Sequence, residues 1–267
     1  VVTHGNGPQV GNALLRVELA RDKAPVLPLG VLVADTEGGM GYMIEQSLQN
    51  RLRAEGINRP VITIITQMLV DRDDPAIANP TKFVGQWYSE EEARKLMAER
   101  DWQMKPDSTR GWRRVVASPT PRKAIEAPTI KKLVAEGNIV IAAGGGGIPV
   151  YLDEKNNLEG LDAVIDKDLA SAVLADEIGA DSLLILTSVD QVMLNFGTPQ
   201  EQALSRCTLS EIKQYQDEGH FPPGSMGPKI QAAIHFLEHG GQSVAITSFA
   251  NARKALRGEA GTTIVPD

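Results

Sequence analysis

Two glycine-dense segments are the first residues of this sequence whose types and spacing could do chemistry. They cover residues 3–11 and 144–147, and each comes directly after a short apolar run. Glycine lets main-chain N–H groups come close to an oxyanion, and a following helix adds the attraction of its N-terminus. Two tight turns without a ligand are the plain alternative, but a pair of such segments at strand ends favours anion binding. The candidate phosphate-binding residues are Gly5, Asn6, Gly7, Gly144, Gly145 and Gly146.

Charged residues near two expected helix starts could neutralise a phosphate group. Lys167 lies between Asp166 and Asp168, and taken alone Asp166 predicts an ordinary N-cap. The second glycine segment lies close by in the sequence, which favours a cation beside a phosphate instead. Lys229 falls in the first turn of an expected helix, where a positive charge is unfavourable unless an anion lies nearby. Lys167, Asp168 and Lys229 are therefore candidate catalytic residues.

The elements that must position these residues alternate between short apolar runs and helical patterns. Apolar runs without in/out alternation, separated by helices, predict an α/β fold with a mainly parallel sheet covered on both faces. Ligands of such folds bind at the carboxyl ends of the strands. We expect Gly38, Gly39 and Gly41 to interrupt the second helix. The expected strands cover 60–66, 138–143, 182–187 and 242–247, and the expected helices begin at residue 8 and cover 28–54, 129–136, 166–178 and 228–239.

The span from residue 71 to residue 126 has a different character. It contains all three tryptophans and several prolines that interrupt any long element. One short helix is expected after Ser89, which is a good N-cap followed by acidic residues. A long irregular surface loop is the alternative, but such loops are uncommon unless they serve as lids or binding elements. We therefore expect residues 71–126 to form a small inserted lid subdomain within a domain that covers residues 1–267.

The whole chain has 267 residues, of which 42% are hydrophobic and 23% charged, as in ordinary globular proteins. No stretch of about 18 apolar residues occurs, so no membrane span is expected. Cys207 is the only cysteine, which rules out an internal disulfide and fits a reducing cytoplasm. The formal charge is −7 and no basic block occurs, so nucleic acid is not an expected partner.

A series of motifs along the chain resembles those of the carbamate kinases. One of them, Asn-Pro-Thr-Lys at 79–82, separates carbamate kinases from most other amino acid kinases. The matching segments are residues 4–11, 41–43, 79–85, 113–119, 144–150, 164–168, 226–229 and 258–262. The resemblance implies the amino acid kinase fold, a three-layer αβα sandwich around a mainly parallel central sheet. It also implies the reaction ATP + carbamate ⇌ ADP + carbamoyl phosphate with Mg²⁺, in a cytoplasmic homodimer that usually forms ATP at the end of arginine breakdown.

The resemblance suggests a role for each candidate side chain. Carbamate already carries an anionic oxygen, so catalysis needs positioning and charge neutralisation rather than a general base. Lys167 and Lys229 would hold the transferred phosphoryl group and the nucleotide phosphates, and Asp168 would orient them. Lys82 would reach from the insert to the carbamoyl phosphate side, and no protein ligand to Mg²⁺ is expected. The residues implied for nucleotide binding are Asp190, Met226 and Pro228.

One departure from the family pattern concerns the N-terminus. Carbamate kinases begin with a strand and a Gly-Gly-Asn-Ala-Leu loop that helps to hold the transferred phosphate, whereas this chain opens with Val1. We therefore expect residues upstream, and we do not expect the polypeptide as it stands to be fully active. The alternatives are another amino acid kinase, acting on acetylglutamate, aspartate, glutamate or UMP, and a non-catalytic nucleotide-binding protein. A dinucleotide-dependent dehydrogenase is disfavoured, because the glycine segments do not match G-x-G-x-x-G in its usual context.

Overall fold

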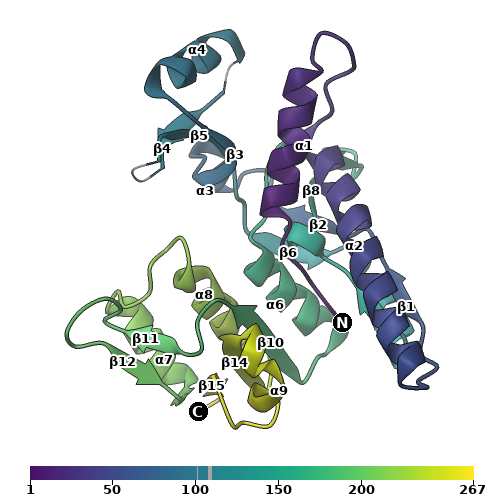
Figure 1. Ribbon diagram of the computed structural model, residues 1–267, viewed down its shortest axis with the longest axis vertical. Coiled ribbons are helices and arrows are strands. Elements are labelled where there is room, and N and C mark those ends of the chain that lie inside the picture. Colours follow the sequence, from purple (N-terminus) through teal and green to yellow (C-terminus); the bar gives the residue numbers. More distant parts are fainter. Residues whose placement is uncertain (101, 108–109) are drawn as a thin grey trace. The chain divides into compact units, whose positions relative to one another are not determined.

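The structure, a computed structural model, describes residues 1–100, 102–107 and 110–267. This part of the chain divides into two compact units, Val1–Ala170 and Ser171–Asp267 (Figure 1). Among the helices of these residues, none is both long and apolar enough to cross a membrane.

The first unit begins with two helices, α1 (Gly7–Leu19) and α2 (Leu29–Ala54). Pro8 lies in the first turn of α1, where a missing N–H group costs nothing. The prediction that glycines interrupt the second helix was wrong, because α2 is continuous over its 26 residues. A Cβ atom at Gly41 would lie 2.2 Å from a methyl carbon of Thr63. Gly41 therefore lets the neighbouring strand approach α2, and packing outweighs its weak helix propensity.

Parallel strand pairs form the centre of the first unit. Strand β1 (Val61–Thr63) pairs in parallel with β7 (Ile139–Ile141), and Val2 adds a parallel bridge to Ile141. Strand β2 (Gln67–Val70) pairs in parallel with β8 (Ile148–Leu152). The antiparallel neighbours are β6 (Pro121–Ala124) on β2 and β9 (Leu158–Gly160) on β8, and helix α5 (Ala127–Ala135) leads into β7.

A separate antiparallel sheet in the first unit has the order β3-β5-β4 (Figure 1). Its strands are β3 (Lys82–Tyr88), β5 (Trp112–Val116) and β4 (Met104–Pro106); helices α3 (Pro75–Ala78) and α4 (Glu90–Arg100) flank β3 in sequence. Helix α4 begins after Ser89, whose hydroxyl accepts the N–H of Glu92 while the Glu92 carboxylate accepts the N–H of Ser89. This reciprocal capping explains why the helix starts where the sequence predicted.

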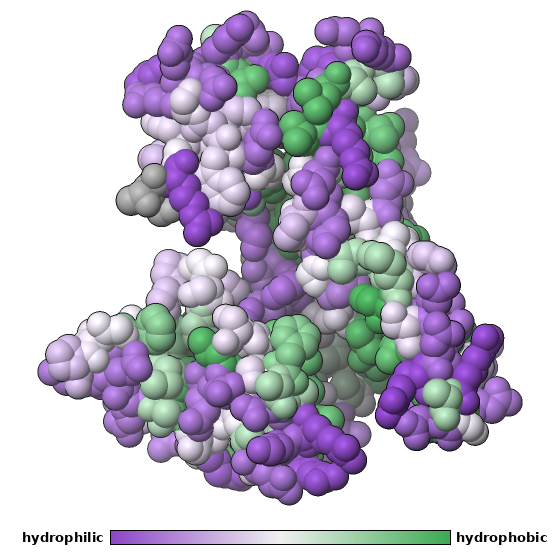
Figure 2. Space-filling model, viewed as in Figure 1, coloured by the Kyte–Doolittle hydropathy of each residue, from purple (hydrophilic) through white to green (hydrophobic). Residues whose placement is uncertain are grey.

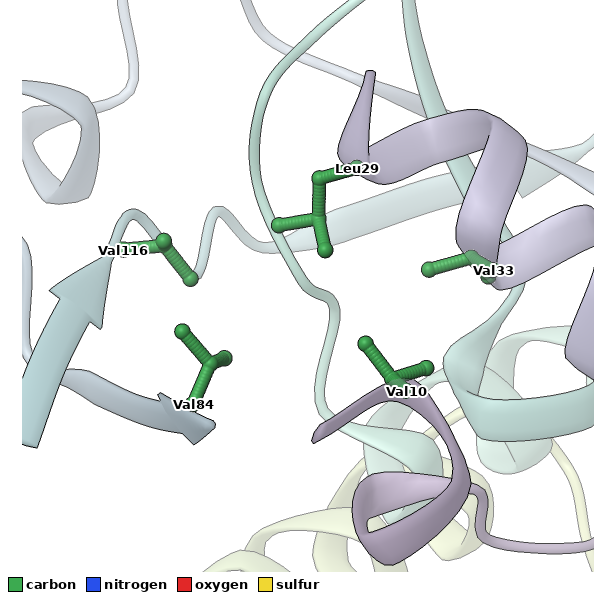
Figure 3. Packing of buried hydrophobic residues seen from close by; sticks show 5 residues of the cluster. All are labelled: Val10, Leu29, Val33, Val84 and Val116. Carbon is green, nitrogen blue, oxygen red and sulfur yellow. The ribbon is translucent and has the colours of Figure 1, made fainter. Parts of the chain in front are cut away.

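A buried apolar cluster attaches this sheet to the two long helices (Figure 3). Val84 on β3 and Val116 on β5 pack with Val10 on α1 and with Leu29 and Val33 on α2. Each of these side chains is at most 7% exposed, so together they bury a substantial apolar area. The start of β3, which carries Lys82, is therefore fixed relative to the start of α1.

The second unit has a four-stranded sheet in the order β10-β14-β15-β13. Strands β10 (Ser182–Thr187) and β14 (Ser243–Ser248) are parallel along six residues, and β15 (Thr262–Val265) is antiparallel to β14 and parallel to β13 (Arg206–Thr208). The remaining elements are α6 (Lys167–Ile178), which begins in the first unit, the hairpin β11 (Val192–Leu194) and β12 (Gln202–Leu204), α7 (Leu209–Asp217), α8 (Met226–Glu238) and α9 (Ala252–Ala255). The prediction of an α/β protein with parallel strands is confirmed.

Apolar side chains also reach the surface. Leu19, Val26 and Leu27, at the end of α1 and in the connection to α2, are 77%, 48% and 40% exposed. On the face drawn in Figure 2, apolar surface occurs in separate patches among hydrophilic side chains. Scattered exposure of this kind is normal for folded proteins and by itself indicates no partner.

Candidate active site

The second glycine segment forms a tight turn directly after strand β7. Gly144–Gly146 make one 3-10 turn, and Gly145 and Gly146 have φ angles of 67° and 103°. A Cβ atom on Gly145 would lie 2.1 Å from the carboxamide of Asn6, and one on Gly146 would lie 2.6 Å from the carbonyl oxygen of Ile165. The turn therefore packs against both the first glycine segment and the residues that precede α6, so three distant stretches of sequence meet here.

The N–H groups of this turn are engaged within the protein. Gly145 donates to the carbonyl oxygen of His4 at 2.7 Å, Gly146 to that of Ala143 at 3.1 Å, and Gly147 to that of Gly144 at 3.1 Å. In the described structure these three N–H groups donate to carbonyl oxygens of the main chain, and binding of an anion by this glycine segment stays a prediction. Glycine is required at position 145 because a side chain there would overlap the carboxamide of Asn6.

Asn6 directly precedes α1, and its side chain reaches α2. Its side chain is 4% exposed, and its Nδ2 donates to the Thr36 hydroxyl oxygen at 2.9 Å. The Thr36 hydroxyl in turn donates to the carbonyl oxygen of Val33 at 2.8 Å. Although Asn6 stands at the N-cap position of α1, its side chain does not cap that helix. Its observed contact is structural, since it ties the first glycine segment to the middle of α2.

Lys82 is held at the start of α6 by Asp166. Its Nζ lies 2.9 Å from Oδ2 of Asp166, although 84 residues separate the two in sequence. The other oxygen of Asp166 accepts the N–H of Asp168 at 2.9 Å and that of Leu169 at 3.4 Å, so Asp166 is also the N-cap that the sequence predicted. Burial alone would raise the pKa of Asp166, but the ammonium of Lys82 and these N–H groups outweigh it and lower the pKa.

Lys167 reaches back toward the first glycine segment. Its Nζ lies 2.8 Å from Oδ1 of Asp168, and a Cβ atom on Gly5 would lie 3.1 Å from its Cδ. The side chains of Lys82 and Lys167 are 39% and 41% exposed, whereas those of Asp166 and Asp168 are 15% and 11% exposed. Two nearly buried carboxylates thus hold two ammonium groups on partly exposed side chains, and that of Lys167 lies against the first glycine segment. This arrangement can attract an anion with several negative oxygens.

The remaining candidate residues belong to the second unit. Helix α8 begins at Met226, two residues before the predicted start at Pro228, and Lys229 lies in its first turn as the sequence predicted. Asp190 lies beyond the end of β10, and its carboxylate accepts the Asn251 side-chain N–H at 2.9 Å. Strands β10 and β14 are parallel neighbours that end together at Thr187 and Ser248. Asp190 and Asn251 therefore join the loops at the carboxyl edge of this sheet, the edge at which such folds bind ligands.

Glu37 is a residue of this region that sequence reasoning missed. Its side chain is 1% exposed, and its Oε2 accepts the Thr66 N–H at 2.8 Å. Among the described residues, its Oε1 has no hydrogen-bond partner. Burial raises the pKa of Glu37 to about 8, partly opposed by the Thr66 N–H and assisted by the charge of Glu126. The sequence signal was an acid beside Gly38 and Gly39, but nothing local revealed that it would be buried.

Residues 1–248 match the model of the amino acid kinase family. The chain belongs to the amino acid kinase family. The α/β fold class and the family resemblance deduced from the sequence are therefore confirmed.

Several relatives and solved structures named as carbamate kinases are similar to nearly the whole of this chain. The carbamate kinase of Pyrococcus furiosus is 50% identical over 268 residues, with 100% of this chain and 85% of the relative covered. The carbamate kinase-like protein YahI of Escherichia coli is 51% identical, with 99% and 84% covered. Among solved structures, the carbamate kinase of Giardia lamblia bound to AMP-PNP has a TM-score of 0.92 and 44% identity, with 99% of this chain and 84% of that chain covered.

Proposed function

We propose that this protein is a carbamate kinase, which transfers a phosphoryl group between ATP and carbamate. The observation that carries the proposal is the pair of partly exposed lysines at the start of α6, Lys82 paired with Asp166 and Lys167 paired with Asp168 and lying against Gly5. Carbamate kinases of several organisms share about half of the residues of this chain over nearly its whole length. The similar Giardia lamblia enzyme was solved with AMP-PNP, which supports ATP and ADP as the nucleotides.

The reaction moves one phosphoryl group between two oxygen atoms. A carbamate oxygen forms a bond to the γ-phosphorus of ATP, the bond from that phosphorus to the bridging oxygen breaks, and ADP leaves with the electron pair. The carbamate oxygen is already anionic, so no proton has to be removed. The main obstacle is the approach of one anion to another, which fixed positive charges can reduce.

Each lysine has a distinct proposed task. Lys167, oriented by Asp168 at 2.8 Å, and Lys229, at the start of α8, contact the transferred phosphoryl group and the nucleotide phosphates. Lys82 contacts the carbamoyl phosphate side, and Asp166 keeps its ammonium in place before substrate binds. The residues proposed to line the phosphate site are Gly5, Asn6, Gly7, Gly144, Gly145 and Gly146, and those proposed for the nucleotide are Asp190, Met226 and Pro228.

Mg²⁺ is proposed to enter with the nucleotide, as MgATP or MgADP. The carboxylates of Asp166 and Asp168 each hold an ammonium group, so they do not form a dedicated cage for the ion. Mg²⁺ commonly binds through substrate phosphates with few protein ligands, which agrees with this donor set.

The biological setting is proposed on the sequence resemblance. It comprises a homodimer in the cytoplasm, residues 71–126 acting as a lid, and the ATP-forming direction at the end of arginine breakdown. Light scattering of the purified protein would test the homodimer, because a single species of one chain mass would contradict it.

An assay of ATP formation tests the function directly. Protein expressed from the complete gene is mixed with carbamoyl phosphate and MgADP, and ATP is measured by a coupled hexokinase reaction. We expect ATP to form with carbamoyl phosphate and carbamate to be the best phosphoryl acceptor in the reverse direction. Preferential phosphorylation of acetylglutamate, aspartate, glutamate or UMP would indicate a different amino acid kinase. Nucleotide binding without any turnover would indicate a non-catalytic protein.

A further inference from the structure

A group of metal-ligating side chains lies in the second unit, outside the residues assigned to the kinase reaction. Asp176 is near the end of α6, and His235 and His239 are four residues apart near the end of α8. One ligand atom from each of these three residues lies within 4.8 Å of the other two. Residues four apart on a helix project from the same face, so the sequence itself places the two imidazoles together.

The two histidine rings lie against each other. Their centroids lie 4.1 Å apart with an interplanar angle of 29°. The Nδ1–H of His239 donates to the carbonyl oxygen of His235 at 2.7 Å, which leaves the Nε2 lone pair of His239 available. Metal-binding histidines commonly use their second ring nitrogen in this way, because such a hydrogen bond fixes the tautomer and the ring orientation.

We propose that Asp176, His235 and His239 form a binding site for a divalent transition-metal ion such as Zn²⁺. Two imidazole nitrogens and one carboxylate oxygen suit Zn²⁺, whereas Mg²⁺ prefers a set made only of oxygen atoms. The site is thus chemically distinct from that of the Mg²⁺ bound to the nucleotide. Three protein ligands would leave one position of a tetrahedral ion to water.

Only small movements are needed to close the site. Zn²⁺ bonds to nitrogen and oxygen of about 2.0–2.1 Å place tetrahedral ligand atoms about 3.3 Å apart. The observed limit of 4.8 Å therefore has to shrink by about 1.5 Å, which rotation of these side chains, none of them fully buried, can provide. The ion would then connect α6 to α8 within the second unit.

The acidic side chains near the cluster differ in whether they are paired. The carboxylate of Glu238 also faces this region but is paired with Lys213. Asp176 supplies the negative charge that would offset part of the charge of the ion.

Metal titration of the untagged protein without nucleotide tests this proposal. Zn²⁺ affinity is measured by calorimetry, and Co²⁺ is used as a spectroscopic probe because its visible bands change with coordination by imidazole. We expect His235→Ala, His239→Ala and Asp176→Asn each to weaken Zn²⁺ binding by at least about tenfold. His220→Ala is the matched control, since His220 lies next to Glu218 and outside the cluster, and it should retain wild-type affinity.

Two results would overturn the proposal. The first is wild-type Zn²⁺ affinity in any one of the three ligand variants. The second is the absence of Co²⁺ bands in the wild-type protein. Far-UV circular dichroism of each variant establishes that it is folded. As a second readout, Zn²⁺ should raise the melting temperature of the wild-type protein and of His220→Ala, but not that of the His235→Ala/His239→Ala double variant.

Discussion

Replacing Lys82 by methionine should lower the catalytic activity of this protein much more than its stability. The change removes the ammonium group and keeps most of the apolar stem of the side chain. If Lys82 acts in the transition state, the loss is one charge-assisted hydrogen bond, about 1.5–3 kcal/mol. This range corresponds to a decrease of about 10- to 150-fold in kcat/KM for carbamoyl phosphate.

The effect of Lys82→Met on stability should be much smaller. The Lys82 side chain is 39% exposed, so solvent screens its ion pair with Asp166, and we expect a loss of about 1 kcal/mol. Lys82 helps to lower the pKa of Asp166 in the folded protein. A lowered carboxyl pKa stabilises the fold above the ordinary value of 3.8, and this contribution is lost as the pH falls through the folded pKa. The stability difference between wild type and variant should therefore be present at neutral pH and vanish in acid.

The assay is steady-state ATP formation from carbamoyl phosphate and MgADP, with urea unfolding measured in parallel from pH 3 to pH 7. Lys123→Met is the control, because Lys123 is an exposed lysine on β6 of the same unit, and it should leave kcat/KM unchanged. A Lys82→Met enzyme with kcat/KM within about twofold of wild type would refute the catalytic role of the ammonium. An equal loss of activity in Lys123→Met would show that the effect is not specific to Lys82.

Other substitutions test the surroundings of the site. Gly145→Ala should destabilise the protein by about 2–5 kcal/mol in urea unfolding, because it combines a positive φ with a Cβ atom 2.1 Å from Asn6; an unchanged midpoint would contradict the packing described. Glu37 has a pKa raised to about 8, so the folded state holds a proton that the unfolded state releases, and stability should decrease as the pH rises from about 4.5 to 8. Glu37→Gln should flatten this slope, which over this pH range changes the free energy of unfolding by at most about 5 kcal/mol, and an unchanged slope would exclude Glu37 as its source. Cys207 is 4% exposed and burial raises its pKa to about 11, so a disulfide reagent should modify it only after unfolding, and rapid labelling of the native protein would contradict its burial.

The sequence predicted those elements whose signals are local. The apolar run at 182–187 became β10 with the same bounds, and the acid at the N-cap of α6 was found where the pattern placed it. Helix α2 was predicted with an interruption because glycine has a low intrinsic helix propensity. Gly41 is instead required by the close approach of Thr63, which is a tertiary contact that no local window contains.

The candidate site was predicted only in part, because some of its contacts are also tertiary. Glycine density and the Asp-Lys-Asp pattern identified Lys167 and both glycine segments, which do lie together. The ion pair of Lys82 with Asp166 could not be deduced, because it depends on how β3 is anchored by Val84. Glu37 was overlooked because burial of a carboxyl group depends on the surrounding fold, whereas an acid on a helix is usually solvated.

The double use of the Asp166 carboxylate has a consequence for how an anion could be taken up. One oxygen accepts the Asp168 N–H in the first turn of α6, and the other forms the ion pair with Lys82. An arriving phosphate could thus replace the aspartate as the counter-ion of Lys82 while the helix keeps its cap. The ammonium group of Lys82 would then be paired with a negative oxygen both before and after the anion binds. When the product dissociates, the ion pair between Lys82 and Asp166 would form again.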